Sequence, residues 1–196
     1  MILQDKSNDE MTAQSAWSSA AAKPAGQPAA SHADLVREIE GRETRFAQAF
    51  SRIVAVLMRD RNFRNLKIAD LEHLVLPAVM TGQWQVARGK QPSAAGTPDA
   101  PAPQIIAPVG VALWARVSPT IDARLSANLD VRMPLAASEW LSGDRFWLMA
   151  VAGDPRYLPN FLKHLHANEF KGADVKMRTR DADGKLTVTM LGKPAA

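Results

Sequence analysis

The sequence predicts an α+β fold, a single domain in which helices flank a mixed, mostly antiparallel sheet. Two observations predict it. The helical and strand patterns follow the order α, α, β, β, α, β, α, β, β, which places helices between strands throughout the chain. The apolar patterns are also short, and each is too small to fold alone, so the elements are expected to share one core.

Two helical patterns open the folded part. Residues 31–59 carry apolar side chains at spacings of three, four and seven, with Asp34 and Glu38 near the start, which predicts an amphipathic helix. Its apolar positions are Leu35, Ile39, Phe46, Phe50, Ile53 and Leu57. A second helix is predicted to end at Gly82, with Pro77 bending or tightening its last turns.

The middle of the chain predicts a hairpin and a short helix. Residues 84–88 and 105–117 have strand patterns, and Pro108 and Gly110 indicate a bulge or an edge in the longer strand. The two strands are expected to pair across the segment between them. Residues 119–128 then predict a short helix with Pro119 near its first turn.

The last third predicts a buried strand, a helix and a second hairpin. Residues 146–152 are continuously apolar, as expected of a central strand, and a helix with Leu158, Phe161, Leu162 and Leu165 follows. Residues 173–180 and 186–191 alternate in polarity. The turn Asp181-Ala182-Asp183-Gly184 between them predicts a hairpin.

Two low-complexity segments lie outside these elements. Residues 1–30 are rich in Ala, Ser and Gln and are predicted to be a disordered tail, without the apolar run of a secretory signal. Residues 89–103 hold four Pro among Ala, Gly and Ser, which predicts a loop inserted in one domain. The folded domain is therefore expected to span residues 31–196.

The composition excludes several classes of function. The 196 residues include no Cys, so disulfides, Cys-ligated metals and thiol nucleophiles are impossible, and no metal site is expected. No apolar stretch is long enough to span a membrane, and the absence of Cys is compatible with a reducing cytoplasm. A net charge of +4 favours an acidic partner but falls short of a dedicated nucleic-acid binder.

Three blocks of sequence resemble a known family. They are LVLPAV at residues 74–79, PVGVALWARVS at residues 108–118 and SEWLSGDRFW at residues 138–147. In this order and spacing, apart from the Pro-rich insertion, they look like the signature blocks of the RTX-toxin-activating lysine acyltransferases of the hemolysin C type. The resemblance covers roughly residues 57–191. Its most specific part is Trp140 and the SGDR block, Ser142-Gly143-Asp144-Arg145, followed by Trp147.

The resemblance implies a fold, an activity and partners. Members are similar in fold to the Gcn5-related acetyltransferases and work in the cytoplasm. They transfer a fatty acyl chain from acyl carrier protein, which serves as donor with no permanently bound cofactor, to internal lysines of an RTX protoxin. The family also suggests a homodimer.

The resemblance also assigns site residues. The family's catalytic Asp falls on Asp144, while its catalytic His falls on Phe63, which cannot accept a proton. Loss of a general base typically lowers a rate by on the order of 10²–10⁴. Either another group is the base, or water deprotonates the lysine more slowly, or the chain is a catalytically silent binding or regulatory protein. None of His32, His73, His164 and His166 lies where the family would place a base.

Other residues are candidates for binding. The resemblance points to substrate contacts from Arg64, Asn65, Trp140, Ser142 and Arg145. The charges of Arg59, Arg61, Arg64 and Lys67, before the second helix, are candidates for docking an acidic carrier protein, and a solvated basic turn is an equally good interpretation. Asp154, before the helix near residue 158, is expected to be its N-cap.

Overall fold

The computed structural model describes residues 31–92, 104–129, 135–181 and 183–192. The chain divides into two compact units, Met1–Glu40 and Gly41–Ala196, and helix α1 (His32–Leu57) begins in the first and ends in the second. The predicted tail, residues 1–30, lies outside the described residues. In the first unit the Ser31 hydroxyl accepts a hydrogen bond from the Asp34 N–H at 3.2 Å and donates to the Asp34 carboxylate at 2.7 Å. This reciprocal cap fixes the start of α1 within one residue of the prediction.

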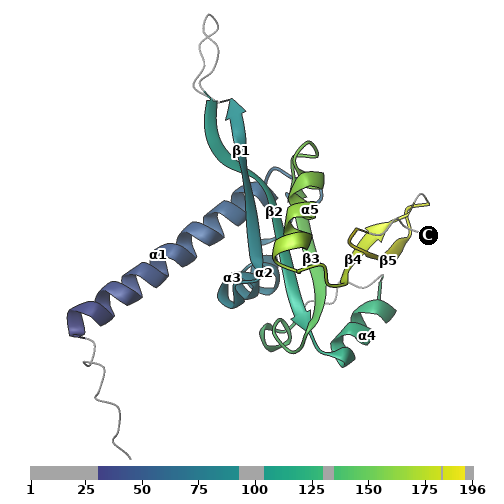
Figure 1. Cartoon of the computed structure of the whole chain (residues 1–196), viewed down its shortest axis with the longest axis horizontal. Coiled ribbons are helices and arrows are strands. Elements are labelled where there is room, and N and C mark those ends of the chain that lie inside the picture. Colours follow the sequence, from purple (N-terminus) through teal and green to yellow (C-terminus); the bar gives the residue numbers. More distant parts are fainter. Residues whose placement is uncertain (1–30, 93–103, 130–134, 182, 193–196) are drawn as a thin grey trace, which may run out of the picture. The chain divides into compact units, whose positions relative to one another are not determined.

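The second unit contains a five-stranded sheet (Figure 1). Its strands are β1 (Trp84–Pro92), β2 (Gln104–Val117), β3 (Arg145–Gly153), β4 (Val175–Arg180) and β5 (Leu186–Met190). They lie in sequence order and pair antiparallel, except that β3 and β4 run parallel. The mixed sheet with its flanking helices confirms the predicted class and is consistent with a Gcn5-related fold.

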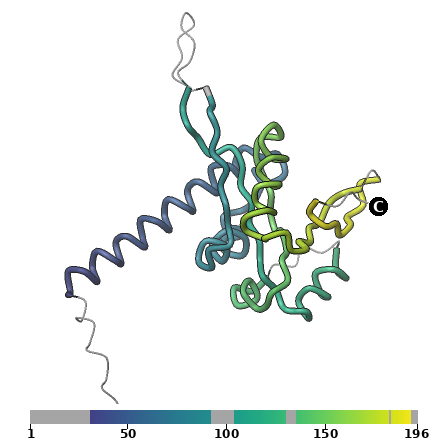
Figure 2. Tube along the Cα trace, viewed as in Figure 1, coloured from purple at the N-terminus to yellow at the C-terminus, as the bar shows by residue number. Residues whose placement is uncertain are grey.

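The parallel pairing of β3 with β4 is short. Only Phe146, Trp147 and Leu148 of β3 pair with β4, while β3 continues to Gly153 alongside β2. Figure 2 shows the β4–β5 hairpin diverging from β3 beyond this contact. Helix α5 (Leu158–Asn168) makes the crossover that a parallel pair requires.

The sheet has one core on each face. Side chains of β2 alternate between them, because successive residues of a strand point to opposite faces. Val111, Leu113, Ala115 and Val117 join the end of α1, helices α2 (Ile68–Leu74), α3 (Leu76–Thr81) and α4 (Pro119–Ala127), and Trp140. On the opposite face Ala112 and Trp114 pack with Phe161 and Leu165 of α5 and with Phe170.

The predicted second helix is divided in two. α2 ends at Leu74, and α3 begins at Leu76 with Pro77 in its first turn, where the missing N–H of proline costs no helical hydrogen bond. Gly82 closes α3 with a φ of 70°, as predicted for a glycine at a helix C-terminus.

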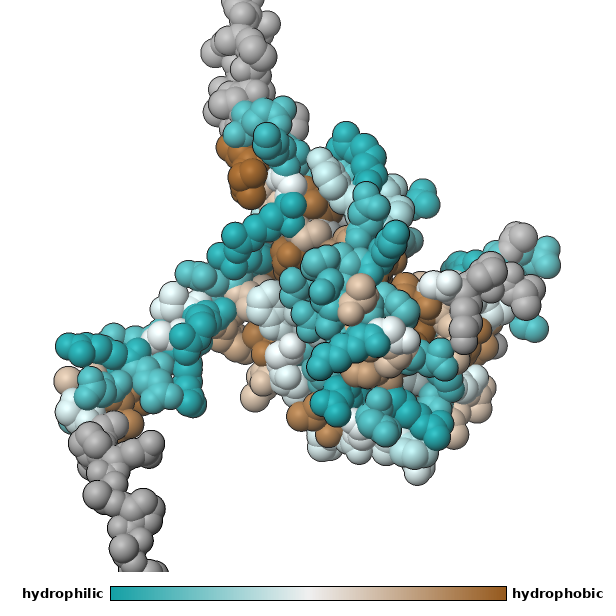
Figure 3. Space-filling model, viewed as in Figure 1, coloured by the Kyte–Doolittle hydropathy of each residue, from teal (hydrophilic) through white to brown (hydrophobic). Residues whose placement is uncertain are grey.

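The first hairpin differs from the prediction at its outer end. β1 continues through residues 89–92, which were assigned to the loop, and residues 93–103 lie outside the described residues. The expected bulge is present, since Ala87 pairs with Gly110 and Arg88 with Pro108, leaving Val109 as the extra residue. Beyond it, Ile105 and Ile106 are 47% and 66% exposed, and hydrophobic surface is visible at this end of the hairpin in Figure 3.

Candidate functional site

The SGDR block forms the tight turn that leads into β3. It follows the short 3-10 helix η1 (Ala137–Glu139). The Ser142 hydroxyl donates to the Glu139 carbonyl at 2.9 Å and accepts from the Ser118 N–H at 3.0 Å. The turn is thereby attached to the junction between β2 and α4. Ser142, predicted to bind substrate, has a structural role in this arrangement.

Gly143 is required by a close approach of two backbone segments. Its N–H donates to the Arg116 carbonyl at 3.1 Å. A Cβ atom here would lie 2.5 Å from the Val117 carbonyl oxygen and 2.7 Å from the Ser118 Cα, closer than any side chain tolerates. Only glycine therefore lets the turn pack against the end of β2.

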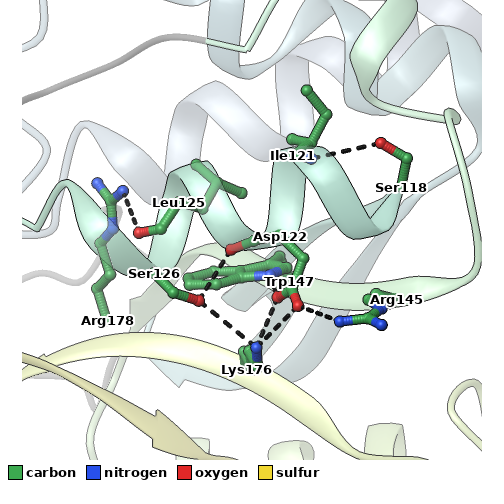
Figure 4. A network of polar contacts seen from close by, with 9 residues as sticks. All are labelled: Ser118, Ile121, Asp122, Leu125, Ser126, Arg145, Trp147, Lys176 and Arg178. Atoms are coloured by element: carbon green, nitrogen blue, oxygen red, sulfur yellow. Dashed lines mark hydrogen bonds and ion pairs between the residues drawn. The ribbon is translucent and has the colours of Figure 1, made fainter.

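Arg145 enters a polar network around Asp122, a residue of α4 that is only 3% exposed (Figure 4). The Asp122 carboxylate accepts hydrogen bonds from the Arg145 guanidinium at 2.6 Å, the Trp147 indole N–H at 2.7 Å and the Lys176 ammonium at 2.7 and 2.9 Å. One carboxylate thus joins α4 to both strands of the parallel pair. The predicted substrate contact of Arg145 competes with this ion pair.

The pKa of Asp122 lies below its usual range. Burial is the largest single influence and would raise it, but the hydrogen bonds from Lys176, Arg145 and Trp147, together with the charge of Lys176, outweigh burial. The carboxylate is therefore ionised at neutral pH and neutralises part of the positive charge beside it. Sequence inspection missed Asp122, because an acid in the first turns of a helix has an ordinary explanation in the helix dipole.

Asp144 is the member of the SGDR block that the packing does not explain. Its side chain is exposed, and no hydrogen bond or ion pair joins its carboxylate to another residue in the part of the chain that the structure describes. It lines a cavity of about 480 Å³ at the start of β3. The other lining residues include Pro119, Asp122, Arg145, Phe146 and Lys176. The carboxylate is thus available to a ligand that enters this cavity.

Phe63 lies at the opposite end of β3 from Asp144. It is half-buried and packs against the core that contains α1 and α3. Its N–H donates to the carbonyl of Asp60, whose carboxylate accepts the N–H of Gly153, the last residue of β3. A strand rises about 3.3 Å per residue, so the two ends of β3 lie on the order of 25 Å apart. The structure therefore does not bring the two family positions, Phe63 and Asp144, together.

The other predicted binding residues lie in two different settings, an exposed turn and the buried core. Arg64 and Asn65 are exposed in the turn after α1, as are Arg59, Arg61 and Lys67. Trp140 has no exposed surface, and its carbonyl accepts from the Gln83 amide at 2.9 Å and from the Arg116 N–H. Trp140 is inaccessible to a substrate in this structure, so its predicted contact finds no support in its placement.

A second cavity, of about 260 Å³, lies at the end of β3 that carries Gly153. Arg59, Asp60 and Asp154 line it. Asp154 is not the N-cap of α5, as the sequence predicted; that position is occupied by Tyr157, and the Asp154 carboxylate instead pairs with the Arg156 guanidinium. The hydrogen bonds from Arg156, the largest influence, lower the pKa of Asp154.

The histidines offer no base beside Asp144. The cavity at the start of β3 has no His among its lining residues in the described part of the chain. His73 is exposed in α2. His164 and His166 lie on α5, where Asn168 contacts the His164 ring and the Ala173 carbonyl contacts the His166 ring.

Part of the chain matches a protein-family model. Residues 104–191 match the model of the HlyC family, the RTX toxin acyltransferase family. The matched residues run from β2 to just past β5 and include Asp122, Asp144 and Lys176. A search of curated proteins finds no significant match. Among the described helices, none combines the length and the apolar character needed to cross a membrane.

Proposed function

We propose that the chain transfers a fatty acyl group from acyl carrier protein to internal lysines of an RTX protoxin-like target in the cytoplasm, because residues 104–191 match the model of the RTX toxin acyltransferase family. The position of Asp144 supports a location for the active site. It is the charged residue of the SGDR block with no partner among the described residues, and it lines a cavity.

The Asp144 carboxylate binds the target lysine and accepts a proton from it. A lysine side chain enters the cavity as an ammonium and is attracted by this carboxylate. Removal of one proton, to the carboxylate and then to water, frees the nitrogen lone pair. The nitrogen attacks the thioester carbon of the donor, a C–N bond forms, the C–S bond breaks, and the thiol leaves with the second proton. Without any Cys, the chain cannot carry the acyl group as a thioester, so the group passes either directly to lysine or through a weaker nucleophile.

The donor is proposed to dock on the basic turn. Arg59, Arg61, Arg64 and Lys67 are all exposed there, and acyl carrier proteins are acidic. Because this turn lies at the far end of β3 from Asp144, a carrier docked on it must deliver its acyl group along the strand. Phe63 then has no part in proton transfer.

Mass spectrometry of the target tests the proposal. The full chain is incubated with acyl-loaded carrier protein and an RTX protoxin, and acylated lysines are measured over time. Asp144→Asn is expected to slow transfer by about 10²–10⁴-fold. The matched control is Asp183→Asn, an exposed acid in the β4–β5 turn, which is expected to leave the rate unchanged.

Two outcomes would contradict this assignment. If the wild-type chain binds the carrier but acylates nothing, the chain is a binding or regulatory protein and the transferase proposal fails. If Phe63→His raises the transfer rate a hundredfold while Asp144→Asn does not lower it, the reaction takes place at the basic turn. Asp144 would then have no catalytic part.

A further inference from the structure

The charged groups of the cavity at the start of β3 are paired unevenly. Its lining residues include the carboxylates of Asp122 and Asp144 and the cations of Arg145 and Lys176. Both cations bond to Asp122, Arg145 at 2.6 Å and Lys176 at 2.7 and 2.9 Å (Figure 4). Asp144 is exposed and directly precedes Arg145 in the chain, yet its carboxylate bonds to no other described residue. One acid therefore holds both cations and leaves the other acid open.

The surroundings of Asp122 explain why it, rather than Asp144, holds Lys176. Asp122 is 3% exposed, and a low dielectric strengthens its attraction to a cation, whereas water weakens an ion pair at the exposed Asp144. The Lys176 ammonium also lies 3.5 Å from the Ser126 hydroxyl and 5.8 Å from the centre of the Trp147 ring. These contacts hold the ammonium beside α4.

We propose that Asp122 is a positioning residue for acyl transfer: by holding Lys176, it keeps the Asp144 carboxylate open to the lysine of the target. The proposal rests on the proposed function of Asp144. Asp122 itself is not required to touch the acceptor, the acyl donor or the reacting atoms. It prevents a lysine of the chain itself from occupying the place of the acceptor.

Lys176 is a competitor because it carries the same chemical group as the acceptor. Both are ammonium groups at the end of a flexible four-carbon stem. A group attached to the same chain reaches a neighbouring site at an effective concentration on the order of millimolar. If Lys176 left Asp122, it would therefore compete with the target lysine for Asp144 and would repel the incoming ammonium. The charge of Arg145 would add to this repulsion.

A crystal structure of Asp122→Asn tests the proposal without any acyl transfer. The amide keeps the shape of the carboxylate and loses its charge. We expect the Lys176 ammonium to move to within about 4 Å of the Asp144 carboxylate, the distance of an ion pair. A folded variant in which Lys176 remains beside residue 122 and away from Asp144 would overturn the proposal.

The kinetics of transfer provide a second readout. Asp122→Asn should raise the KM for the protoxin by about tenfold and leave kcat within about twofold, because the competition affects binding of the acceptor. The double variant Asp122→Asn/Lys176→Met should restore the KM of the wild type, since the competing ammonium is gone. If Asp122 were merely structural, the double variant would be at least as impaired, because more bonds of the network are lost.

Two further variants serve as controls. Glu139→Gln removes a carboxylate that pairs with Arg124 at 2.7 Å but is not among the described lining residues of the cavity, so it should leave the KM unchanged. Lys176→Met alone should keep the KM within about twofold of the wild type, because the ammonium that it removes is already held away from Asp144. A KM that falls about tenfold in Lys176→Met would overturn the proposal even if Asp122→Asn does not fold.

The outcomes separate the proposal from the function on which it rests. If the wild-type chain acylates no lysine, the proposed function fails, and the position of Lys176 in Asp122→Asn alone decides whether Asp122 holds it. If the wild type transfers acyl groups but the double variant is no better than Asp122→Asn, Asp122 has only a structural role and the positioning proposal fails.

Discussion

A single carboxylate, that of Asp122, holds two cations and an indole together in a buried position. Removing one member of such a network leaves the charges or hydrogen-bonding groups of the others unpaired. The free-energy cost of these unpaired groups exceeds the net contribution of the intact interactions. We therefore expect Asp122→Asn to lower the free energy of unfolding by about 2–4 kcal/mol at neutral pH. Chemical denaturation measures this change. Asp144→Asn is the control, since an exposed carboxylate without a partner should matter by less than about 0.5 kcal/mol.

The same carboxylate makes the effect depend on pH. The pKa of Asp122 is lower in the folded state than the value of about 3.9 in an unfolded chain. Its contribution to stability is therefore complete above that value and is lost as the pH falls through the folded pKa. The stability difference between wild type and Asp122→Asn should stay constant from pH 7 to about pH 5 and narrow as the pH falls below about 4. A difference that is constant with pH would contradict an ionised Asp122.

Among the structural elements, the turn between α1 and α2 is a basic surface available to an acidic partner. We expect the double variant Arg61→Glu/Arg64→Glu to weaken binding of the acyl carrier protein by about tenfold or more at low salt, with a smaller effect at high salt. Fluorescence anisotropy of labelled carrier measures the affinity. Neither side chain makes a hydrogen bond or ion pair with another described residue, so the fold should tolerate both changes.

A control variant separates docking from overall charge. Lys163→Glu/Lys171→Glu changes the net charge by the same amount, at exposed positions on α5 and just after it. Binding that weakens equally in both double variants would indicate a general electrostatic attraction and would contradict docking on the turn.

At the scale of the whole molecule, the fold was largely predictable from local patterns. The spacing of apolar residues located α1, Pro119 marked the start of α4, and the Asp-rich turn located the β4–β5 hairpin. The predicted bulge near Pro108 is also present. The prediction of a loop over residues 89–103 was wrong at its start. Gly89 and Pro92 are residue types typical of loops, but the pairing of β1 with β2 continues through them.

The site was less predictable than the fold. Asp122 contacts Arg145 and Lys176, which lie 23 and 54 residues away along the chain, and no local pattern encodes contacts over that range. The separation of Phe63 from Asp144 likewise depends on the length and direction of β3. Family resemblance supplied both residue positions but no information on the distance between them.

The β4–β5 hairpin should be the part of the sheet that opens first. β3 and β4 pair through only three residues, and every residue of β5 is half-buried, whereas the centre of β2 is fully buried. Local opening requires least free energy where few contacts are lost. Native-state hydrogen exchange should therefore show lower protection for β4 and β5 amides than for β2 amides. Equal protection in both would show that the sheet opens as one unit.

The Asp122 network also has a consequence for the order of folding. The β1–β2 and β4–β5 hairpins form from neighbouring segments, but the carboxylate connects α4 with strands that arrive from much later in the chain. Contacts that close such long loops form late in folding. The chain must lose conformational entropy to close the loop before the contact can stabilise it. The network therefore stabilises the native state more than the transition state. Its main kinetic effect is therefore to slow the unfolding of a sheet that has already assembled.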